Sequence, residues 1–83
     1  MKVKYFAWVR ERIGKGEETI EPPDDVRTIE DLIGWLTGRG ESYAYAFEKP
    51  QVIRAAIDQA HVRQDATIAG AREIAFFPPM TGG

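Results

Sequence analysis

The sequence predicts an α+β roll in which one main helix, accompanied by one short helix, packs across a mixed sheet of about five strands. Two observations favour this fold. One segment has apolar residues at helical spacing, whereas several shorter segments are rich in β-branched and aromatic residues. The 83 residues suffice for one domain with a small core. We expect residues 1–77 to form this domain and residues 78–83 to form an extended C-terminal tail.

The first strand is predicted over residues 2–9, where β-branched and aromatic residues alternate weakly. One face carries Val3, Tyr5 and Ala7, and the other carries Phe6 and Trp8. Apolar residues on both faces are typical of a central strand. Residues 9–14 then predict one helical turn closed by Gly14, and residues 17–21 predict a second strand that ends before Pro22-Pro23.

The main helix is predicted over residues 28–38. Thr28 lies three residues before Asp31, which approximates a capping box at the start of the helix. The apolar stripe that follows consists of Ile29, Leu32, Ile33 and Leu36. Gly34 in the interior should cost roughly 1 kcal/mol of helix stability relative to alanine. Gly38 and Gly40 can each supply the left-handed residue that ends a helix.

The second half of the chain alternates short elements. Residues 42–47 predict a short helix, although Tyr43, Tyr45 and Phe47 also alternate as in a strand. Strands are then predicted over residues 52–57, 61–63 and 72–77, with a turn at Asp58-Gln59 between the first two. The first and last strands are apolar on both faces. We therefore place them side by side and parallel in the centre of the sheet, as in the β-grasp architecture of ubiquitin.

Composition narrows the possible functions. The net charge of -2 gives no electrostatic footprint for nucleic acid, and the absence of cysteine excludes a thiol nucleophile and thiolate metal ligands on this chain. The single histidine, His61, lies beside a predicted turn without partner ligands, so no metal site is expected. The N-terminal apolar stretch is too short for a signal peptide or a membrane span. We therefore expect a cytoplasmic protein without a membrane partner.

The most informative segment is the C-terminal end, Phe76-Phe77-Pro78-Pro79-Met80-Thr81-Gly82-Gly83. The prolines stop the preceding strand, and the two glycines place a carboxylate on a thread without side chains that can enter a narrow channel. A frayed, inert terminus is the alternative. Adjacent residues of a strand point to opposite faces, so we expect one of Phe76 and Phe77 to be exposed and to bind a partner. Arg10, at the end of the first strand, is a further candidate partner contact.

Several segments together resemble the small, sulfur-carrying subunit of molybdopterin synthase, and the resemblance covers essentially the whole chain. They are the opening Lys2-Val3-Lys4-Tyr5-Phe6-Ala7-Trp8-Val9-Arg10-Glu11, the helix start Thr28-Ile29-Glu30-Asp31-Leu32, the strand Ala55-Ala56-Ile57-Asp58-Gln59 and the closing Glu73-Ile74-Ala75-Phe76-Phe77-Pro78-Pro79-Met80-Thr81-Gly82-Gly83. The Phe-Phe-Pro-Pro-x-Thr-Gly-Gly ending is the most specific of them. Asp58 stands where we expect the family's asparagine, and an ionised aspartate accepts hydrogen bonds but does not donate them.

The resemblance implies a sulfur carrier that is not an enzyme by itself. An adenylating enzyme would use ATP to activate the Gly83 carboxylate, and a sulfur donor protein would convert it to a thiocarboxylate. The tail, Gly82-Gly83 foremost, would then deliver sulfur to a pyranopterin precursor inside the large synthase subunit, within a heterotetramer. No cofactor would be bound permanently. The residues expected to contact partners are Arg10, Phe76, Phe77, Pro78, Pro79, Met80 and Thr81.

Other functions remain open at this point. A ubiquitin-like protein modifier would use the same activated terminus to modify a lysine of a target protein. A sulfur carrier of another pathway, such as the thiamine type, would use the same thiocarboxylate. An inert β-grasp binding module would use neither. The proline-stiffened tail favours insertion into a fixed channel over free reach toward varied targets.

Overall fold

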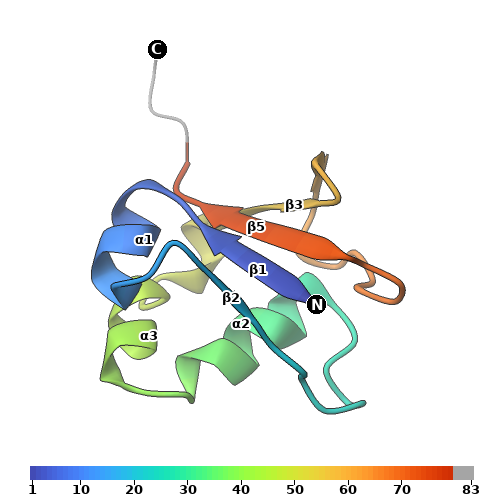
Figure 1. Cartoon of the computed structure of the whole chain (residues 1–83), viewed down its shortest axis with the longest axis horizontal. Coiled ribbons are helices and arrows are strands. Elements are labelled where there is room, and N and C mark those ends of the chain that lie inside the picture. The colour runs from blue at the N-terminus through green and yellow to red at the C-terminus, as the bar shows by residue number, and fades with distance from the viewer. Residues whose placement is uncertain (80–83) are drawn as a thin grey trace.

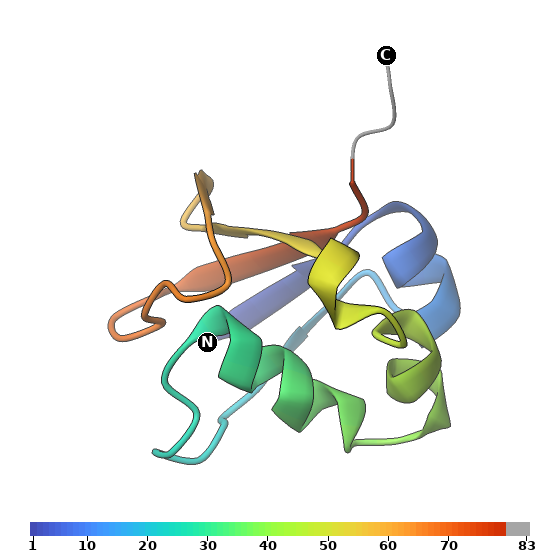
Figure 2. The same cartoon turned by 180° about the vertical axis from the view of Figure 1, so that it is seen from behind.

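A five-stranded mixed sheet, with strand order β2-β1-β5-β3-β4, packs one face against the helices (Figures 1 and 2). The structure is a computed structural model that describes residues 1–79. Its elements are β1 (Lys2–Tyr5), α1 (Ala7–Ile13), β2 (Glu17–Thr19), α2 (Ile29–Thr37), α3 (Glu41–Ala46), the 3-10 helix η1 (Pro50–Val52), β3 (Arg54–Ile57), β4 (Ala60–Val62) and β5 (Glu73–Phe77). β1 and β5 are parallel neighbours in the centre, which confirms the predicted α+β roll.

The first strand is shorter than predicted. It ends at Tyr5, and the next residues turn out of the strand, because Ala7 has a φ of 53° and begins helix α1. This helix buries Val9 and Ile13, four residues apart, so tertiary packing outweighs the β propensity of the residues before it. Gly14, with a φ of 91°, ends α1 in the left-handed conformation as expected.

The capping box that the sequence predicts for α2 is present. The backbone N–H of Asp31 donates to Thr28 Oγ1 at 3.1 Å, and the N–H of Thr28 donates to Asp31 Oδ2 at 3.2 Å. The prediction that Gly38 or Gly40 ends the helix in the left-handed conformation is wrong, and Gly40 has an extended backbone with a φ of 160°. Gly38 has a φ of −78° and is not left-handed, because the last turn tightens and its N–H bonds to the carbonyl oxygens of Trp35 and Leu36.

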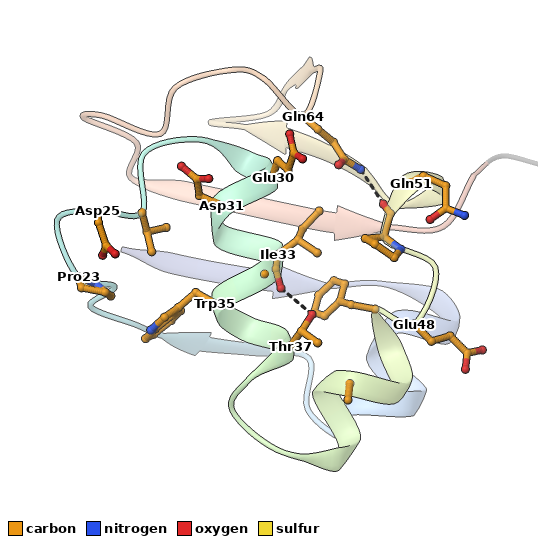
Figure 3. A pocket seen from close by; sticks show the side chains of 15 residues that line it. Pro23, Asp25, Glu30, Asp31, Ile33, Trp35, Thr37, Glu48, Gln51 and Gln64 are labelled. Carbon is orange, nitrogen blue, oxygen red and sulfur yellow. Dashed lines mark hydrogen bonds between the residues drawn. The ribbon is translucent and has the colours of Figure 1, made fainter.

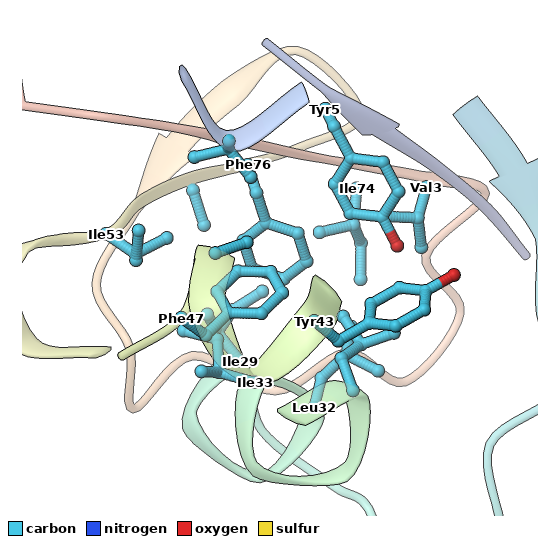
Figure 4. Packing of buried hydrophobic residues seen from close by; sticks show 14 of the residues in the cluster. Val3, Tyr5, Ile29, Leu32, Ile33, Tyr43, Phe47, Ile53, Ile74 and Phe76 are labelled. Carbon is cyan, nitrogen blue, oxygen red and sulfur yellow. The ribbon is translucent and has the colours of Figure 1, made fainter. Parts of the chain in front are cut away.

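Phe76 lies in the middle of the core (Figure 4). Its ring meets the edge of Phe47 at a centroid distance of 5.5 Å and stacks against Tyr5 at 6.4 Å. Ile29, Leu32, Ile33 and Leu36 from α2 close the core on the other side. The helix alternative for residues 42–47 is confirmed, since Tyr43 and Phe47 point inward at helical spacing whereas Tyr45 is 54% exposed.

The turn between β3 and β4 explains Asp58. Both Asp58 and Gln59 have left-handed backbones, with φ of 47° and 74°, as a two-residue type I′ hairpin requires. The Asp58 carboxylate also accepts hydrogen bonds from the N–H groups of Arg72, at 3.1 Å, and Glu73, at 2.9 Å. An aspartate at this position therefore fixes the start of β5.

Glu18, on β2, connects its strand to β1, to α3 and to the loop between α2 and α3. Its carboxylate accepts hydrogen bonds from the hydroxyls of Tyr5, at 2.8 Å, and Tyr43, at 2.6 Å, and it pairs with Arg39 at 3.2 Å and with Lys15 at 3.7 Å. The Glu18 side chain is only 11% exposed. Burial alone would raise its pKa, but the two hydroxyls and the two cations outweigh burial and lower it. Burial and the neighbouring carboxylate raise the pKa of Tyr5.

We predict that Glu18→Gln lowers the free energy of unfolding by about 1–3 kcal/mol at pH 7, because charge-assisted hydrogen bonds are lost in a nearly buried site. A lowered folded-state pKa stabilises the fold at higher pH and ceases to do so as the pH falls. The difference between the two proteins should therefore shrink below pH 4.5, the ordinary value for glutamate. Urea unfolding at several pH values measures it, and a difference that does not change with pH would contradict the ionic role.

Candidate functional site

The C-terminal end of β5 delivers the chain to the predicted tail. Along β5 the side chains alternate, so Ile74 and Phe76 face the core whereas Ala75 and Phe77 face the outer side of the sheet. Phe76 is fully buried, and its ring cannot contact a partner while the sheet is intact. Of the two phenylalanines singled out by the sequence, Phe77 is therefore the half-exposed one that a partner can reach.

Phe6 is a neighbour of Phe77 that sequence reasoning did not select. β1 and β5 pair Tyr5 with Phe76, and the Phe6 N–H donates to the Phe76 carbonyl at 3.0 Å. The Phe6 backbone is still extended, with φ of −127° and ψ of 154°, so its side chain lies on the outer side of the sheet near the C-terminal end of β5. Phe6 is 46% exposed and lies just before the first turn of α1. Its signal in the sequence was ambiguous, because residues 2–9 alternate as one long strand would.

Two alanines extend this surface across the sheet. Ala75 pairs with Ala56 of β3, and Ala56 pairs with His61 of β4, so all three lie on the outer face with Phe77. The His61 ring contacts the edge of Phe77 at a centroid distance of 5.3 Å. We call Phe6, Ala56, Ala75 and Phe77 the apolar strip. Ala56 is only 7% exposed, so Phe6, Ala75 and Phe77 supply the accessible part of this shallow apolar surface, which is suited to protein contact.

Charges border the apolar strip. Arg54 pairs with Phe77 across β3 and β5 and is exposed, and Lys4 forms an ion pair with Glu73 at 3.3 Å. The predicted contact Arg10 is exposed on α1, the helix that begins directly after Phe6. Helix α1 lies beside the C-terminal end of β5 in both views (Figures 1 and 2).

The predicted tail is described only in part. Pro78 and Pro79 follow Phe77 and are half-buried. Met80, Thr81, Gly82 and Gly83 lie outside the described residues, so their expected roles stay predictions. Within residues 1–79, no group of three or more acidic or histidine side chains is placed to hold a metal ion, and no helix has the length and apolar character needed to cross a membrane.

The whole chain, apart from its first two residues, matches the model of a known family. The match covers residues 3–83 and is described as the ThiS family. This chain belongs to the ThiS family. Two relatives of this ThiS-family chain are named molybdopterin synthase sulfur carrier subunit. The protein from Haemophilus influenzae is 37% identical and that from Escherichia coli K12 is 36% identical, each over 100% of this chain and 99% of the relative.

Solved structures have the same fold as the ThiS-family chain. SAMP1 from Haloferax volcanii superposes with a TM-score of 0.72 at 24% identity, over 100% of this chain and 98% of the other. A putative molybdopterin converting factor subunit 1 from Pyrococcus furiosus gives a TM-score of 0.70 at 27% identity, over 95% of each chain. The likeness to SAMP1 concerns the fold alone. The predicted ubiquitin-like β-grasp architecture is confirmed.

We predict opposite consequences for the two adjacent phenylalanines. Phe76→Ala should lower the free energy of unfolding by about 3–5 kcal/mol, because it empties the centre of a small core. Phe77→Ala should cost only about 1 kcal/mol, because a half-exposed ring buries less apolar area. Thermal and urea unfolding of the two variants measure these changes. Equal losses would mean that Phe77 supports the fold as much as Phe76 does.

Proposed function

We propose that this chain is the sulfur carrier subunit of a molybdopterin synthase and acts in molybdenum cofactor biosynthesis. The observation that carries the proposal is similarity along the entire length to two relatives of that name, at 37% and 36% identity. The structure supports it through β5, which fixes the root of the tail in the core and leaves Phe77 accessible beside it.

The reactive group in this proposal is the Gly83 carboxylate. A carboxylate is a poor acylating group, so an adenylating enzyme first joins it to AMP from ATP and releases pyrophosphate. A sulfur donor protein then supplies sulfur, AMP leaves, and Gly83 carries a thiocarboxylate. The thiocarboxylate is an anionic sulfur nucleophile at neutral pH. In the large subunit its sulfur attacks a carbon of the pyranopterin precursor and displaces an oxygen leaving group. Water then cleaves the bond between the Gly83 carbonyl carbon and the sulfur, which leaves the sulfur on the precursor and restores the Gly83 carboxylate.

In this proposal the small and large subunits have different roles, and the residues of this chain suggest which role belongs to each. The sequence contains no cysteine, so sulfur is carried on the backbone terminus, and the large subunit provides the catalytic side chains. Gly82 has no side chain to obstruct attack at Gly83. The chain needs no permanently bound cofactor, because ATP is consumed at the adenylating enzyme. We place the cycle in the cytoplasm, where ATP is available, and the synthase as a heterotetramer of two large and two small subunits.

The apolar strip is the surface on which the large subunit docks in this proposal. It lies at the root of the tail, so a partner that covers Phe6 and Phe77 also receives Pro78 and Pro79 at a fixed position. Proline restricts the backbone, which limits the directions in which the next residues leave the surface. The adenylating enzyme acts on the same terminus, so the two partners compete for this end of the molecule.

A ubiquitin-like protein modifier is the alternative that shares the activated Gly83. The two functions differ in the product. A sulfur carrier gives a thiocarboxylate on the free chain, whereas a modifier gives an amide bond between Gly83 and a lysine of a target. The proline pair after Phe77 favours the carrier, because it stiffens the tail near the body.

We predict that the intact chain gains about 16 mass units after incubation with the adenylating enzyme, ATP and a sulfur donor, since one carboxyl oxygen is replaced by sulfur. Intact-mass spectrometry measures the gain. Removal of Gly83, or addition of one residue after it, should abolish the gain and molybdopterin formation without changing the unfolding curve. Molybdopterin formation by either variant would refute the proposed role of the terminus.

We predict that Phe77→Ala and Phe6→Ala each weaken association with the large subunit by about tenfold or more, because each removes an aromatic ring that is at least partly accessible at the root of the tail. Titration calorimetry with the purified large subunit measures the affinity. Tyr45→Ala is a control, since Tyr45 is an aromatic residue with a larger exposed fraction (54%, against 46% for Phe6) but belongs to α3. Unchanged affinity in both strip variants would place the large-subunit interface elsewhere.

A further inference from the structure

A groove follows the solvent side of α2, away from the apolar strip (Figure 3). Its volume is about 930 Å³, and it extends from the loop before α2 to α3 and η1. The apolar part of its lining comes from Pro23, Val26, Ile33, Trp35, Ala44, Phe47 and Pro50. Trp35 is half-buried, and the guanidinium of Arg39 lies 5.2 Å from its ring centroid. Ile33 and Phe47 belong to the core, so the accessible apolar surface of the groove comes from its other apolar lining residues.

Gly34 lies in this groove at a position where the fold itself has no need of glycine. It is exposed, it lies in the interior of α2, and a Cβ added there would meet nothing within 4 Å. Its backbone is not in the left-handed region. Glycine in a helix interior costs roughly 1 kcal/mol relative to alanine. The fold therefore does not explain why residue 34 is glycine. Binding of a partner does, because the missing side chain leaves space in the groove for a side chain of the partner.

The charged side chains that line the groove are all acidic, and the Arg39 guanidinium lies over the ring of Trp35 at its edge. Four carboxylates line it, those of Asp25, Glu30, Asp31 and Glu48, and its lining within the described residues includes no lysine or arginine. Glu48 pairs with Arg12 at 3.3 Å, and Asp31 accepts the backbone hydrogen bonds of the capping box. Asp25 and Glu30 form no ion pair within residues 1–79. An acidic rim over an apolar floor is complementary to a basic segment with one apolar anchor.

We propose that this α2 groove binds a lysine- or arginine-rich segment of a partner protein, which inserts one apolar side chain over Gly34. The location allows binding while the tail is engaged, because α2 and the C-terminal end of β5 lie at opposite sides of the molecule in both views (Figures 1 and 2). The inference rests on the groove, Gly34 and the rim charges. It does not depend on sulfur chemistry at Gly83.

The experiment uses the full chain, labelled with ¹⁵N, and a synthetic peptide of about twelve residues that contains lysines, arginines and one central leucine. Amide shifts should saturate and map to Gly34, Trp35 and Glu48. Affinity should fall about tenfold between low and physiological salt, because exposed charges are screened. A peptide with glutamates in place of the basic residues, and one with serine in place of the leucine, should each bind at least about tenfold more weakly.

Matched variants locate the site. Gly34→Leu fills the floor and should weaken peptide binding about tenfold, and the double change Asp25→Lys and Glu30→Lys should do the same by reversing the rim charge. Glu11→Lys changes an exposed charge on α1 and should have no effect. Unfolding curves establish that each variant is folded. Binding that is unchanged in the folded groove variants, equal for the acidic peptide, or mapped to the apolar strip would overturn the proposal.

Discussion

The parallel pairing of β1 with β5 is the constraint on which the rest of the structure depends. Parallel neighbours cannot be joined by a tight turn, so the remainder of the domain has to form the connection between them. The pairing puts Tyr5 beside Phe76 in the core and makes β5 a central strand with neighbours on both sides. The strand that precedes the tail is thereby the middle one of the five strands. A tail that leaves such a strand has a fixed origin.

This arrangement gives two adjacent residues different tasks. Phe76 holds the sheet to the helices, whereas Phe77 is presented on the outer face one peptide bond later. A partner that binds Phe77 consequently contacts a residue whose position is fixed by the packing of Phe76 in the core. Errors of one residue in the register of β5 would exchange the two rings and expose the core residue. The Asp58 carboxylate opposes such a slip, because it binds the N–H groups at the start of β5.

Sequence patterns predicted those elements well that are stabilised by residues close together in the chain. The capping box and the stripe of α2 lie within a few residues, and α2 formed as expected. The end of β1 could not be predicted from such local signals, because two patterns overlap there. The weak alternation over residues 2–9 is compatible with a strand, whereas the spacing of Val9 and Ile13 is compatible with a helix. Packing decided between them. The hydrogen bonds of Glu18 could not be predicted from the sequence either, since Tyr5 and Tyr43 are far from it along the chain. The position of Phe6 on the outer side of the sheet follows only from the pairing of β1 with β5.

The geometry also constrains how a carrier of this kind can be handed between partners. The proposed adenylating enzyme and large subunit both need Gly83 and the surface at its root, so they bind in turn, and each exchange requires complete dissociation. A second contact at the opposite side of the molecule removes that requirement. A partner held at the α2 groove stays at high effective concentration while the tail moves from one active site to the next. Weak binding at the groove is sufficient for this purpose, because two linked contacts of modest affinity together bind much more tightly than either contact alone. A shallow, acidic groove with an open Gly34 suits such a weak and reversible contact better than it would a permanent interface.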